Sequence, residues 1–301
     1  MPIRQITIIG TGLIGGSVAL SLSKAGFRGK IVGCDRPEVL AQAKRLGVIH
    51  EGVADPVQAC SGSDLVVLST PVGTVISLID KLAPDLPAQT LLTDVGSTKA
   101  EIVACAQAAF GSNAQQRFLA GHPMAGKENG GVEFADSDLF RGAVWFFTPL
   151  PKQRLTSGRI AEYLAWIQKF GVKISLLDPK THDELCAWIS HVPQMISTAV
   201  ASTLVEEYGM NAPLLETGGR ALREMTRTAS SPYSMWRDVA LTNKENIGNA
   251  LMKLEQKLAH IRENLGTHEL EAEFEQAHRL KNHSPQRHRG TEKNKRTTRW
   301  A

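Results

Sequence analysis

Hydrophobic and polar positions divide the chain into two regions with different periodicities. From the start to about residue 178, short apolar runs bounded by turn residues alternate with segments long enough to form helices. This alternation is typical of a mostly parallel sheet with crossover helices. The predicted strands span residues 5–9, 30–34, 65–69, 91–94, 118–121, 144–148 and 172–176.

Downstream of Pro179 the sequence predicts helices only, from Thr181 toward Val205 and again from Met235 onward. In the last predicted helix, apolar residues are spaced by four and three positions: Ile247, Leu251, Leu254, Leu258, Ile261 and Leu265. Such a seam needs a partner helix, which packing within the chain can supply. Because a helical domain of about 100 residues leaves much apolar surface to cover, a homodimer is favoured.

A glycine-rich turn follows the first predicted strand. Gly10, Gly12 and Gly15 have the spacing Gly-x-Gly-x-x-Gly, and Leu13 and Ile14 begin the helix that follows. The first glycine allows the tight turn, the second lets backbone amides approach a pyrophosphate, and the third permits close packing of helix on strand. The helix N-terminus then faces the anion, so the motif predicts a dinucleotide site.

The second predicted strand ends in Asp35, twenty residues after the last of these glycines. Its carboxylate can accept hydrogen bonds from ribose hydroxyls and would repel a 2′-phosphate, which favours NAD over NADP. Arg36 keeps NADP as the alternative, since a guanidinium can accommodate the phosphate, and an exposed turn would also explain both residues. Ser69, Thr70 and Pro71 end another predicted strand and are expected to line the same cleft.

These patterns predict an α/β fold with three segments. A Rossmann-type, mostly parallel sheet domain that binds the dinucleotide covers residues 1–178, an all-helical substrate and dimerisation domain covers 179–280, and a basic disordered tail covers 281–301. The tail contains seven of the 34 Lys and Arg residues and one of the 30 acidic residues. It lacks apolar periodicity, so a solvated extension is favoured over a nucleic-acid-binding element.

Composition narrows the class of protein further. The chain has 301 residues, of which 42% are hydrophobic, and it contains no apolar run of about 18 residues that could span a membrane. No secretory or transit segment is recognised before the first strand, so the expected location is the cytoplasm. The four cysteines lie far apart without metal-ligand spacing: Cys34, Cys60, Cys105 and Cys186. We expect them to be reduced, with no disulfide and no metal site.

The segment from Asp94 to Lys99 follows a predicted strand at the ligand-binding edge of the sheet. It could direct hydroxyl groups and an ammonium group into the cleft. A structural alternative is that Ser97 or Thr98 caps the helix that follows.

His122 is the strongest candidate for a reacting side chain. It lies in a predicted loop between Gly121 and Gly126, where the glycines allow close approach of the backbone and Pro123 restricts His122 to extended geometry. A neutral imidazole near pH 7 can accept a proton from a hydroxyl group while hydride leaves the same carbon.

Taken in order, these motifs resemble the prephenate and arogenate dehydrogenases of tyrosine biosynthesis. The resemblance covers about residues 5–265 and is carried by Gly10 to Gly15, Asp94-Val95-Gly96-Ser97-x-Lys99, Gly121-His122-Pro123-Met124-Ala125-Gly126, Trp188-Ile189-Ser190-His191-Val192-Pro193 and Thr226-Arg227-x-Ala229. It implies an NAD-dependent oxidative decarboxylation of a cyclohexadienol acid. Prephenate would give 4-hydroxyphenylpyruvate, and arogenate would give tyrosine.

The resemblance also implies a role for each matched side chain. His122 would draw the proton from the ring hydroxyl, and Ser97 would orient that hydroxyl or the nicotinamide. Arg227 would bind the ring carboxylate, a task suited to a bidentate guanidinium. His191 would belong to the network around the substrate.

Two positions depart from the pattern of the family. Gln194 stands where some prephenate-specific members carry a second histidine, and its amide could serve a keto or an amino side chain. Glu224 stands where several relatives place aspartate. Its longer side chain leaves open whether it orients the guanidinium of Arg227. The choice between prephenate and arogenate is open for the same reasons. Trp236 is expected at the edge of the substrate domain, either in the core or against the ligand.

Two other functions fit part of the sequence. Another two-domain dehydrogenase, such as a β-hydroxyacid dehydrogenase or a pyrroline-carboxylate reductase, would share the domain plan but not the histidine segment. A dinucleotide-binding sensor without turnover would not need His122, Ser97 and Arg227 together. The expected partners are therefore a small-molecule substrate and a second copy of the chain, without a membrane.

Overall fold

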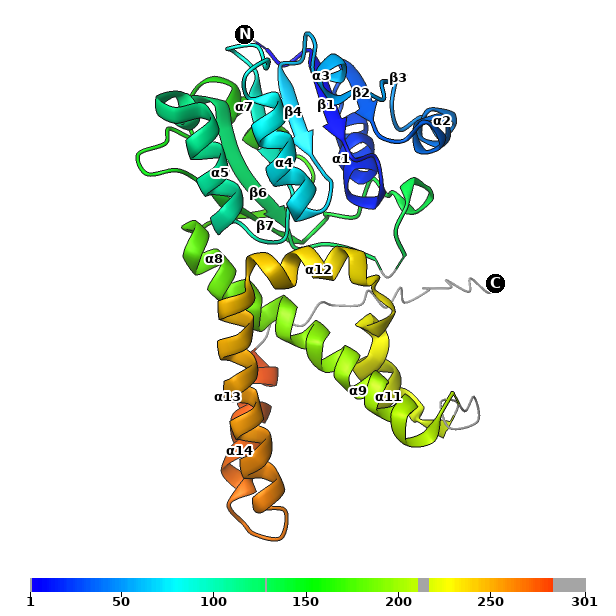
Figure 1. Cartoon of the computed structure of the whole chain (residues 1–301), viewed down its shortest axis with the longest axis vertical. Helices are drawn as coiled ribbons and strands as arrows, with labels where there is room; N and C mark the ends of the chain where they lie inside the picture. The colour runs from blue at the N-terminus through cyan, green and yellow to red at the C-terminus, as the bar shows by residue number, and fades with distance from the viewer. Residues whose placement is uncertain (1, 128, 211–216, 284–301) are drawn as a thin grey trace, which may run out of the picture. The chain divides into compact units, whose positions relative to one another are not determined.

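A single eight-stranded sheet is built from residues between Gln5 and Leu176 (Figure 1). This computed structural model describes residues 2–127, 129–210 and 217–283. The strands are β1 Gln5–Ile9, β2 Lys30–Cys34, β3 Glu51–Gly52, β4 Leu65–Leu68, β5 Leu91–Asp94, β6 Phe118–Pro123, β7 Val144–Thr148 and β8 Lys173–Leu176. All seven predicted strands are confirmed. The sequence does not predict β3, because two residues are too few to show a pattern.

Helices connect the strands and continue after the sheet. They are α1 Leu13–Lys24, α2 Pro37–Arg45, α3 Pro56–Ala59, α4 Val72–Leu82, α5 Ala100–Phe110, α6 Ala114–Arg117, α7 Gly158–Gln168, α8 Pro179–Cys186, α9 Val192–Tyr208, α11 Gly219–Thr226, α12 Tyr233–Thr242, α13 Lys244–Glu263 and α14 Leu270–His283. Short 3-10 turns lie at Gly111–Asn113, Val132–Phe134 and Arg227–Ser230, and a π-helical turn lies at Ala187–His191. The switch from strands to helices after β8 agrees with the predicted fold class.

Apolar side chains are buried on both faces of the sheet. One core cluster packs the strands against α1 and α7, through residues such as Leu22 and Ile167. The other packs them against α4 and α5, through residues such as Ile79 and Ile102. A strand that is buried on both faces needs a continuous apolar run, which explains the sequence Leu-Val-Val-Leu of β4.

The strand order is β3-β2-β1-β4-β5-β6-β7-β8, so the direction of chain progression reverses between β1 and β4. Open α/β sheets bind their ligands beyond the carboxyl ends of the strands at such a reversal. The parallel register aligns Ile9 with Leu68 and Leu68 with Asp94. The residues that follow, including Gly10 and Ser69, therefore share this edge of the sheet.

After the sheet, α8, the π-helical turn and α9 follow one another without a break in the chain. Pro193 lies in the first turn of α9, and because it has no backbone N–H it interrupts the regular α-helical ladder. The widened turn before it absorbs this interruption. His191 is the last residue of that turn, and its side chain is fully buried.

Two carboxylates from these later helices cap helices of the sheet. Asp183 of α8 accepts the backbone N–H groups of Lys99 and Ala100, at 2.7 and 2.9 Å, where α5 begins. Asp238 of α12 accepts the N–H of Gly73 at 2.9 Å, where α4 begins. A negative charge satisfies and stabilises a helix N-terminus. These contacts hold α8 and α12 at the edge where the strands end.

Packing divides the chain into two compact units, Met1–Ala250 and Leu251–Ala301. In the second unit, Lys257 of α13 and Glu273 of α14 form an ion pair. The last predicted helix is wrong at its end, because α13 stops at Glu263 and α14 begins seven residues later, at Leu270. The division predicted at residue 178 stays a prediction.

The predicted tail begins inside a helix. Residues 281–283 belong to α14, so disorder is wrong for them, and residues 284–301 lie outside the described part of the chain. No helix in residues 2–127, 129–210 and 217–283 is both long enough and apolar enough to cross a membrane.

Candidate functional site

The three glycines after β1 meet different surroundings. A side chain on Gly10, whose φ is 92°, would place Cβ 2.5 Å from the carbonyl oxygen of Ser69. On Gly15, Cβ would lie 2.0 Å from the carbonyl oxygen of Gly10, so only glycine allows helix and strand to pack this closely. At Gly12, nothing lies within 4 Å of the added Cβ. This open space at the start of α1 can admit a phosphate group.

The first turn of α1 suits an anion. It contains no acidic residue and no side-chain cap, and the predicted cofactor residues Leu13 and Ile14 are its first, half-buried members. Asp35 lies beside it and accepts the backbone N–H of Thr11 at 2.7 Å and that of Arg36 at 2.8 Å. The carboxylate is thus fixed at the end of β2, where the ribose of a dinucleotide is expected.

The neighbouring strand end has polar groups that lack partners. The buried hydroxyls of Ser69 and Thr70 have no hydrogen-bond partner in the described part of the chain, and Pro71 precedes the first turn of α4. Buried hydroxyls without partners cost free energy that a bound polar ligand can recover. Arg36 forms an exposed ion pair with Glu38, with Nη1 to Oε1 at 3.3 Å. These features fit a dinucleotide bound where the strand order reverses between β1 and β4, which we call the switch point.

His122 lies in β6 and not in a loop, so the predicted loop is wrong at this position. It stands opposite Phe146 of β7, which runs antiparallel to β6, and its side chain is only 7% exposed. The sheet extends past the predicted end because β7 supplies backbone partners up to Pro123. Gly121 is needed beside it, since an added Cβ would lie 2.9 Å from Nε1 of Trp145.

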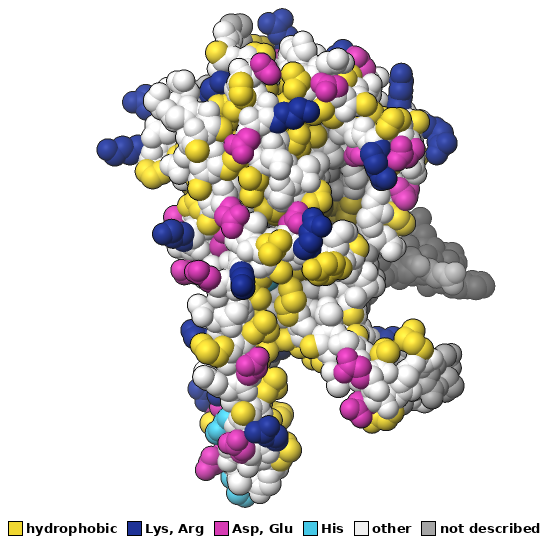
Figure 2. Space-filling view, viewed as in Figure 1, with side chains coloured by type: hydrophobic (Ala, Val, Ile, Leu, Met, Phe, Trp, Pro, Cys, Tyr) yellow, Lys and Arg dark blue, Asp and Glu magenta, His cyan; other side chains and the backbone are white. Residues whose placement is uncertain are grey.

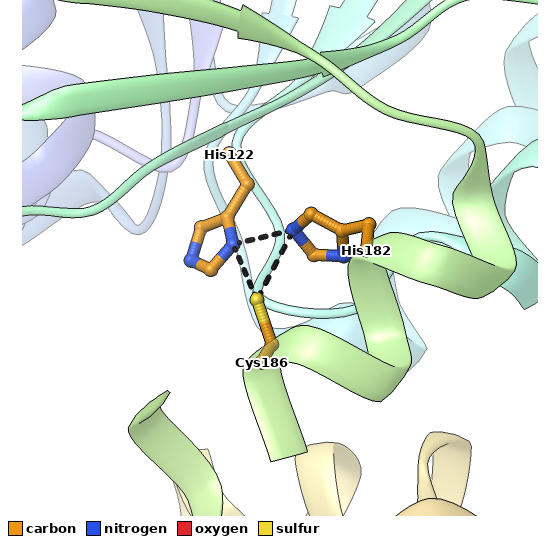
Figure 3. Close-up of side chains that lie close together, drawn as sticks. All are labelled: His122, His182 and Cys186. Atoms are coloured by element: carbon orange, nitrogen blue, oxygen red, sulfur yellow. Dashed lines mark hydrogen bonds between the residues drawn. The ribbon is translucent and has the colours of Figure 1, made fainter. Parts of the chain in front are cut away.

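A row of buried polar side chains leads away from His122. Its Nδ1 lies 2.9 Å from Nε2 of His182, and Nδ1 of His182 lies 2.8 Å from Oδ1 of Asp183. Cys186, one helical turn after His182, places Sγ 3.4 Å from His182 Nε2 and 3.9 Å from His122 Nδ1 (Figure 3). The sheet supplies the first histidine, and α8 supplies the other three residues.

Burial keeps the histidines of this region neutral at pH 7. It lowers the pKa of His122 well below its ordinary value, and nearby His182 and Lys99 add to the effect. Burial also lowers the pKa of His182, although the hydrogen bond to Asp183 opposes it. The pKa of His191 falls to about 4, again chiefly through burial.

Two imidazole nitrogens and the thiol sulfur form the kind of group that can hold a metal ion. The ligand atoms of His122, His182 and Cys186 all lie within 4.8 Å of one another. Two nitrogens bound to one tetrahedral zinc ion stand about 3.3 Å apart, given Zn–N bonds of about 2.0 Å. The observed 2.9 Å between the nitrogens of His122 and His182 is the distance of a direct hydrogen bond.

The segment after β5 differs from its prediction in two ways. The ammonium group of Lys99 does not point into a cleft, because it is fully buried, pairs with Asp94 and donates to the carbonyl of Gly121 at 2.7 Å. Burial raises the pKa of Asp94 and lowers that of Lys99, while their mutual attraction opposes both shifts. The predicted cap by Ser97 or Thr98 is also wrong, since neither bonds to α5 and Asp183 takes this role.

His191 lies at the start of α9 with one nitrogen satisfied. Asn243 donates from Nδ2 to His191 Nδ1 at 3.1 Å, so the ring proton must be on Nε2. That buried nitrogen, and Nε1 of the neighbouring Trp236, have no hydrogen-bond partner among the described residues. They are two buried donors that a ligand's oxygen atoms could satisfy.

Arg227 lines a pocket of about 470 Å³. Its lining residues include Gly126, which follows His122 by four positions in the sequence. The pocket is lined by Gly126, Lys127, Asn129, Phe134, Arg227, Thr228 and Ser231. Arg227 and Lys127 are its cationic side chains, and the ammonium group of Lys127 pairs with Asp136 at 3.1 Å. Gln194 donates to the carbonyl of Thr228 at 2.9 Å, so its amide holds the backbone next to Arg227.

The structure brings some predicted residues together and separates others. Ser97 follows β5 and His122 is the second-last residue of the adjacent β6, without a hydrogen bond between them in the described part of the chain. Glu224 pairs with exposed Arg220 at 2.8 Å. Sequence reasoning misses His182, Asp183 and Lys127. A histidine and an aspartate side by side in the first turns of a predicted helix were the available signal for the first two.

A sheet reversal that suits a nucleotide, a buried neutral imidazole at the same edge and a pocket lined by Arg227 are typical of the class of nucleotide-binding α/β proteins to which dehydrogenases belong. Residues 18–176 match the family model for the nucleotide-binding domain of prephenate dehydrogenase, and residues 178–286 match that for its dimerization domain. The chain belongs to the prephenate dehydrogenase family.

Individual relatives agree with this assignment. A prephenate dehydrogenase of Lactococcus lactis is 37% identical over 249 residues, which are 80% of this chain and 66% of that protein, just under two thirds of its length. The Aquifex aeolicus prephenate dehydrogenase, solved with hydroxyphenyl propionate and NAD+, is 33% identical, with 94% of this chain and 96% of that chain covered and a TM-score of 0.80. The Synechocystis arogenate dehydrogenase is 25% identical, with 92% and 96% covered and a TM-score of 0.70.

Proposed function

We propose that the chain catalyses the oxidative decarboxylation of prephenate to 4-hydroxyphenylpyruvate, or of arogenate to tyrosine, with NAD as the oxidant, in tyrosine biosynthesis. The observation that carries this proposal is His122, a buried imidazole that is neutral at pH 7 and lies at the nucleotide-binding edge of the sheet. The Lactococcus and Aquifex relatives, both prephenate dehydrogenases, support it.

The residues at the switch point fit NAD. The open space at Gly12 and the first turn of α1 would take the pyrophosphate, and Asp35 would accept the hydroxyls of the adenosine ribose. Ser69 and Thr70 would direct their unpartnered hydroxyls toward the bound molecule. When bound, NAD supplies the acceptor for hydride. A 2′-phosphate would meet the carboxylate of Asp35, so NADP is the weaker alternative.

His122 would act as the general base. As the bond between hydrogen and the hydroxyl-bearing ring carbon gives up its electron pair as hydride, His122 takes the hydroxyl proton and the carbon becomes a carbonyl. The carbon–carbon bond to the ring carboxylate then breaks, carbon dioxide leaves, and its electron pair makes the ring aromatic. The former carbonyl oxygen recovers a proton from His122 and becomes the phenol. Ser97, at the adjacent strand end, would orient the hydroxyl group.

The substrate has at least two anionic groups, and the chain offers separate donors for them. Arg227 would bind the ring carboxylate from the pocket that it shares with Lys127. The buried donors of His191 and Trp236 would bind the side chain. Gln194 would support this arrangement indirectly, by holding the backbone beside Arg227.

We also infer a homodimer. Residues 178–286 match a dimerization domain, and large hydrophobic side chains reach the surface of the helices after the sheet (Figure 2). Trp188, Ile189 and Tyr208 are about half exposed or more, at 47%, 49% and 58%. Apolar area of this kind favours burial against a second copy. The cytoplasm is the proposed location, and the four free cysteines suit its reducing conditions.

One assay tests the proposed reaction. Purified protein is given prephenate or arogenate, each with NAD or NADP, and the absorbance of the reduced nicotinamide is followed. Turnover with at least one substrate, with a higher kcat/KM for NAD than for NADP, is expected. Absence of turnover with both substrates would overturn the proposal.

The variant His122→Asn tests the base. Asparagine can keep a hydrogen bond to His182 but has no basic lone pair, so kcat should fall by about 10² to 10⁴, which is about 2.7–5.4 kcal/mol. The Kd for NAD should stay unchanged. His268→Asn, at an exposed histidine of the second unit, is the control and should keep full turnover. An unchanged kcat in His122→Asn would remove His122 from the mechanism.

A further inference from the structure

The hydrogen-bonded row formed by Asp183, His182 and His122 determines which ring nitrogen of each histidine carries the proton. Both oxygens of Asp183 face donors, because they accept the N–H groups of Lys99 and Ala100 at 2.7 and 2.9 Å. A carboxylate held in this way offers only acceptor atoms to His182. Nδ1 of His182, 2.8 Å from Asp183 Oδ1, must therefore carry the ring proton.

A neutral imidazole has one ring proton, so Nε2 of His182 carries a lone pair. This lone pair faces Nδ1 of His122 at 2.9 Å. Two lone pairs cannot form a hydrogen bond, and Nδ1 of His122 must be the donor. Its own single proton is then used, which leaves the lone pair of His122 on Nε2.

Cys186 favours the same arrangement of protons. Burial raises the pKa of its thiol to about 12, so the sulfur is protonated at pH 7. The S–H group lies 3.4 Å from Nε2 of His182 and can donate weakly to the same lone pair (Figure 3). Because His122 Nδ1 and the Cys186 thiol both face Nε2 of His182 as donors, a proton on that nitrogen is less favourable.

We propose that Asp183 and His182 are positioning residues that fix the tautomer of His122, with the proton on Nδ1 and the lone pair on Nε2. In water, a neutral imidazole exchanges between two tautomers, and only one of them presents a base at a given nitrogen. The hydrogen-bonded row removes the other tautomer. The use of that lone pair rests on the proposed function, whereas the tautomer is a property of the protein alone.

Asp183→Asn reverses the row. When the amide nitrogen takes the place of Oδ1, it donates to Nδ1 of His182 and loses the bond from the N–H of Lys99, while the amide oxygen in the place of Oδ2 still accepts the N–H of Ala100. The proton of His182 then moves to Nε2, and that of His122 moves to Nε2 as well, so the base is lost. We expect kcat to fall by about 10² to 10⁴, as for a catalytic histidine held in the wrong tautomer, with little change in KM for either substrate. Asp178→Asn, the same change at the N-cap of α8, is the matched control and should leave kcat unchanged.

Two substitutions of His182 separate hydrogen bonding from packing. The carbonyl oxygen of glutamine can accept the Nδ1 proton of His122, so His182→Gln should keep kcat within about tenfold of the original value. Leucine cannot accept, so His182→Leu should lose about 100-fold or more. Equal losses in the two variants would overturn the proposal.

A direct measurement does not depend on turnover. Nitrogen-15 NMR of the labelled, folded protein distinguishes a histidine protonated on Nδ1 from one protonated on Nε2. We expect Nδ1–H for His122 in the unaltered protein and Nε2–H in Asp183→Asn. Nε2–H for His122 in the unaltered protein would overturn the inference. An inactive protein that shows the expected tautomers would count against the proposed reaction and not against the row.

Discussion

Lowering the pH from 7 to 5 should destabilise the folded chain through His191. This side chain is fully buried, and its pKa falls from 6.5 to about 4 on folding, chiefly because burial disfavours the imidazolium. At pH 5 the unfolded chain protonates His191 while the folded chain keeps it neutral. Because the unfolded state binds more protons, the free energy of unfolding decreases as the pH falls through 6.5 and levels off below about 4.

The size of the effect follows from the two pKa values. The statistical weight of each state is multiplied by 1 + 10^(pKa − pH) when His191 can bind a proton. At pH 5 this factor is about 30 for the unfolded state and about 1.1 for the folded state. His191 therefore lowers the free energy of unfolding by about 2 kcal/mol relative to pH 7. Burial also lowers the pKa of His122 and His182, so both shift stability in the same direction. A variant is therefore needed to isolate the contribution of His191.

His191→Asn is suited to this test. Asparagine does not titrate, and its side-chain oxygen can still accept the hydrogen bond from Asn243. Urea unfolding is followed by tryptophan fluorescence at pH 7 and pH 5, with the protomer concentration fixed because dimerisation contributes to stability. The unaltered protein should lose about 2 kcal/mol more than the variant between the two pH values. Equal losses would refute a neutral, buried His191.

Three more substitutions test other parts of the site. Arg227→Ala should raise the substrate KM about tenfold or more with a smaller effect on kcat, and an unaltered KM in steady-state assays would place the carboxylate elsewhere. Gly12→Ala should weaken NAD binding about tenfold or more by placing a methyl group in the phosphate space, yet leave the thermal midpoint unchanged, because the added Cβ meets nothing within 4 Å; an unchanged Kd by titration would contradict this. Lys99→Met should lower the free energy of unfolding by about 3–5 kcal/mol, since it leaves Asp94 buried and unpaired. Adding Asp94→Asn should recover most of that loss in denaturant melts, and no recovery would argue against the ion pair as the cause.

The sheet could be predicted because a buried strand needs a local run of apolar residues, which is visible in the sequence. The two-residue β3 has no such run, and the sequence does not reveal it. The end of α13 could not be predicted for a different reason. Apolar residues continue at helical spacing through Leu265, but the helix ends at Glu263, and Asn264 bonds back to the carbonyl of His260 at 2.9 Å. Asparagine commonly forms such local bonds at helix ends.

The site was predictable where function depends on local backbone geometry. The glycines after β1 have the spacing that a tight turn and close helix packing require, and both close contacts are present at Gly10 and Gly15. His182 could not be placed, because it lies 60 residues from His122 and meets it only through packing of α8 on the sheet edge. The burial of Lys99 is equally invisible in the sequence, since its partner Asp94 precedes a turn that could have faced solvent.

Asp183 makes the base depend on the docking of the helices that follow the sheet. The same carboxylate caps α5, directly after the turn that carries Ser97, and holds the proton of His182. If α8 moved away from the sheet edge, α5 would lose its cap and His122 would lose the acceptor at Nδ1 in a single step. His122 would then be free to adopt either tautomer, even though β6 and its own position were unchanged. The sheet therefore supplies the imidazole, and the docked helix determines which of its nitrogens can accept a proton.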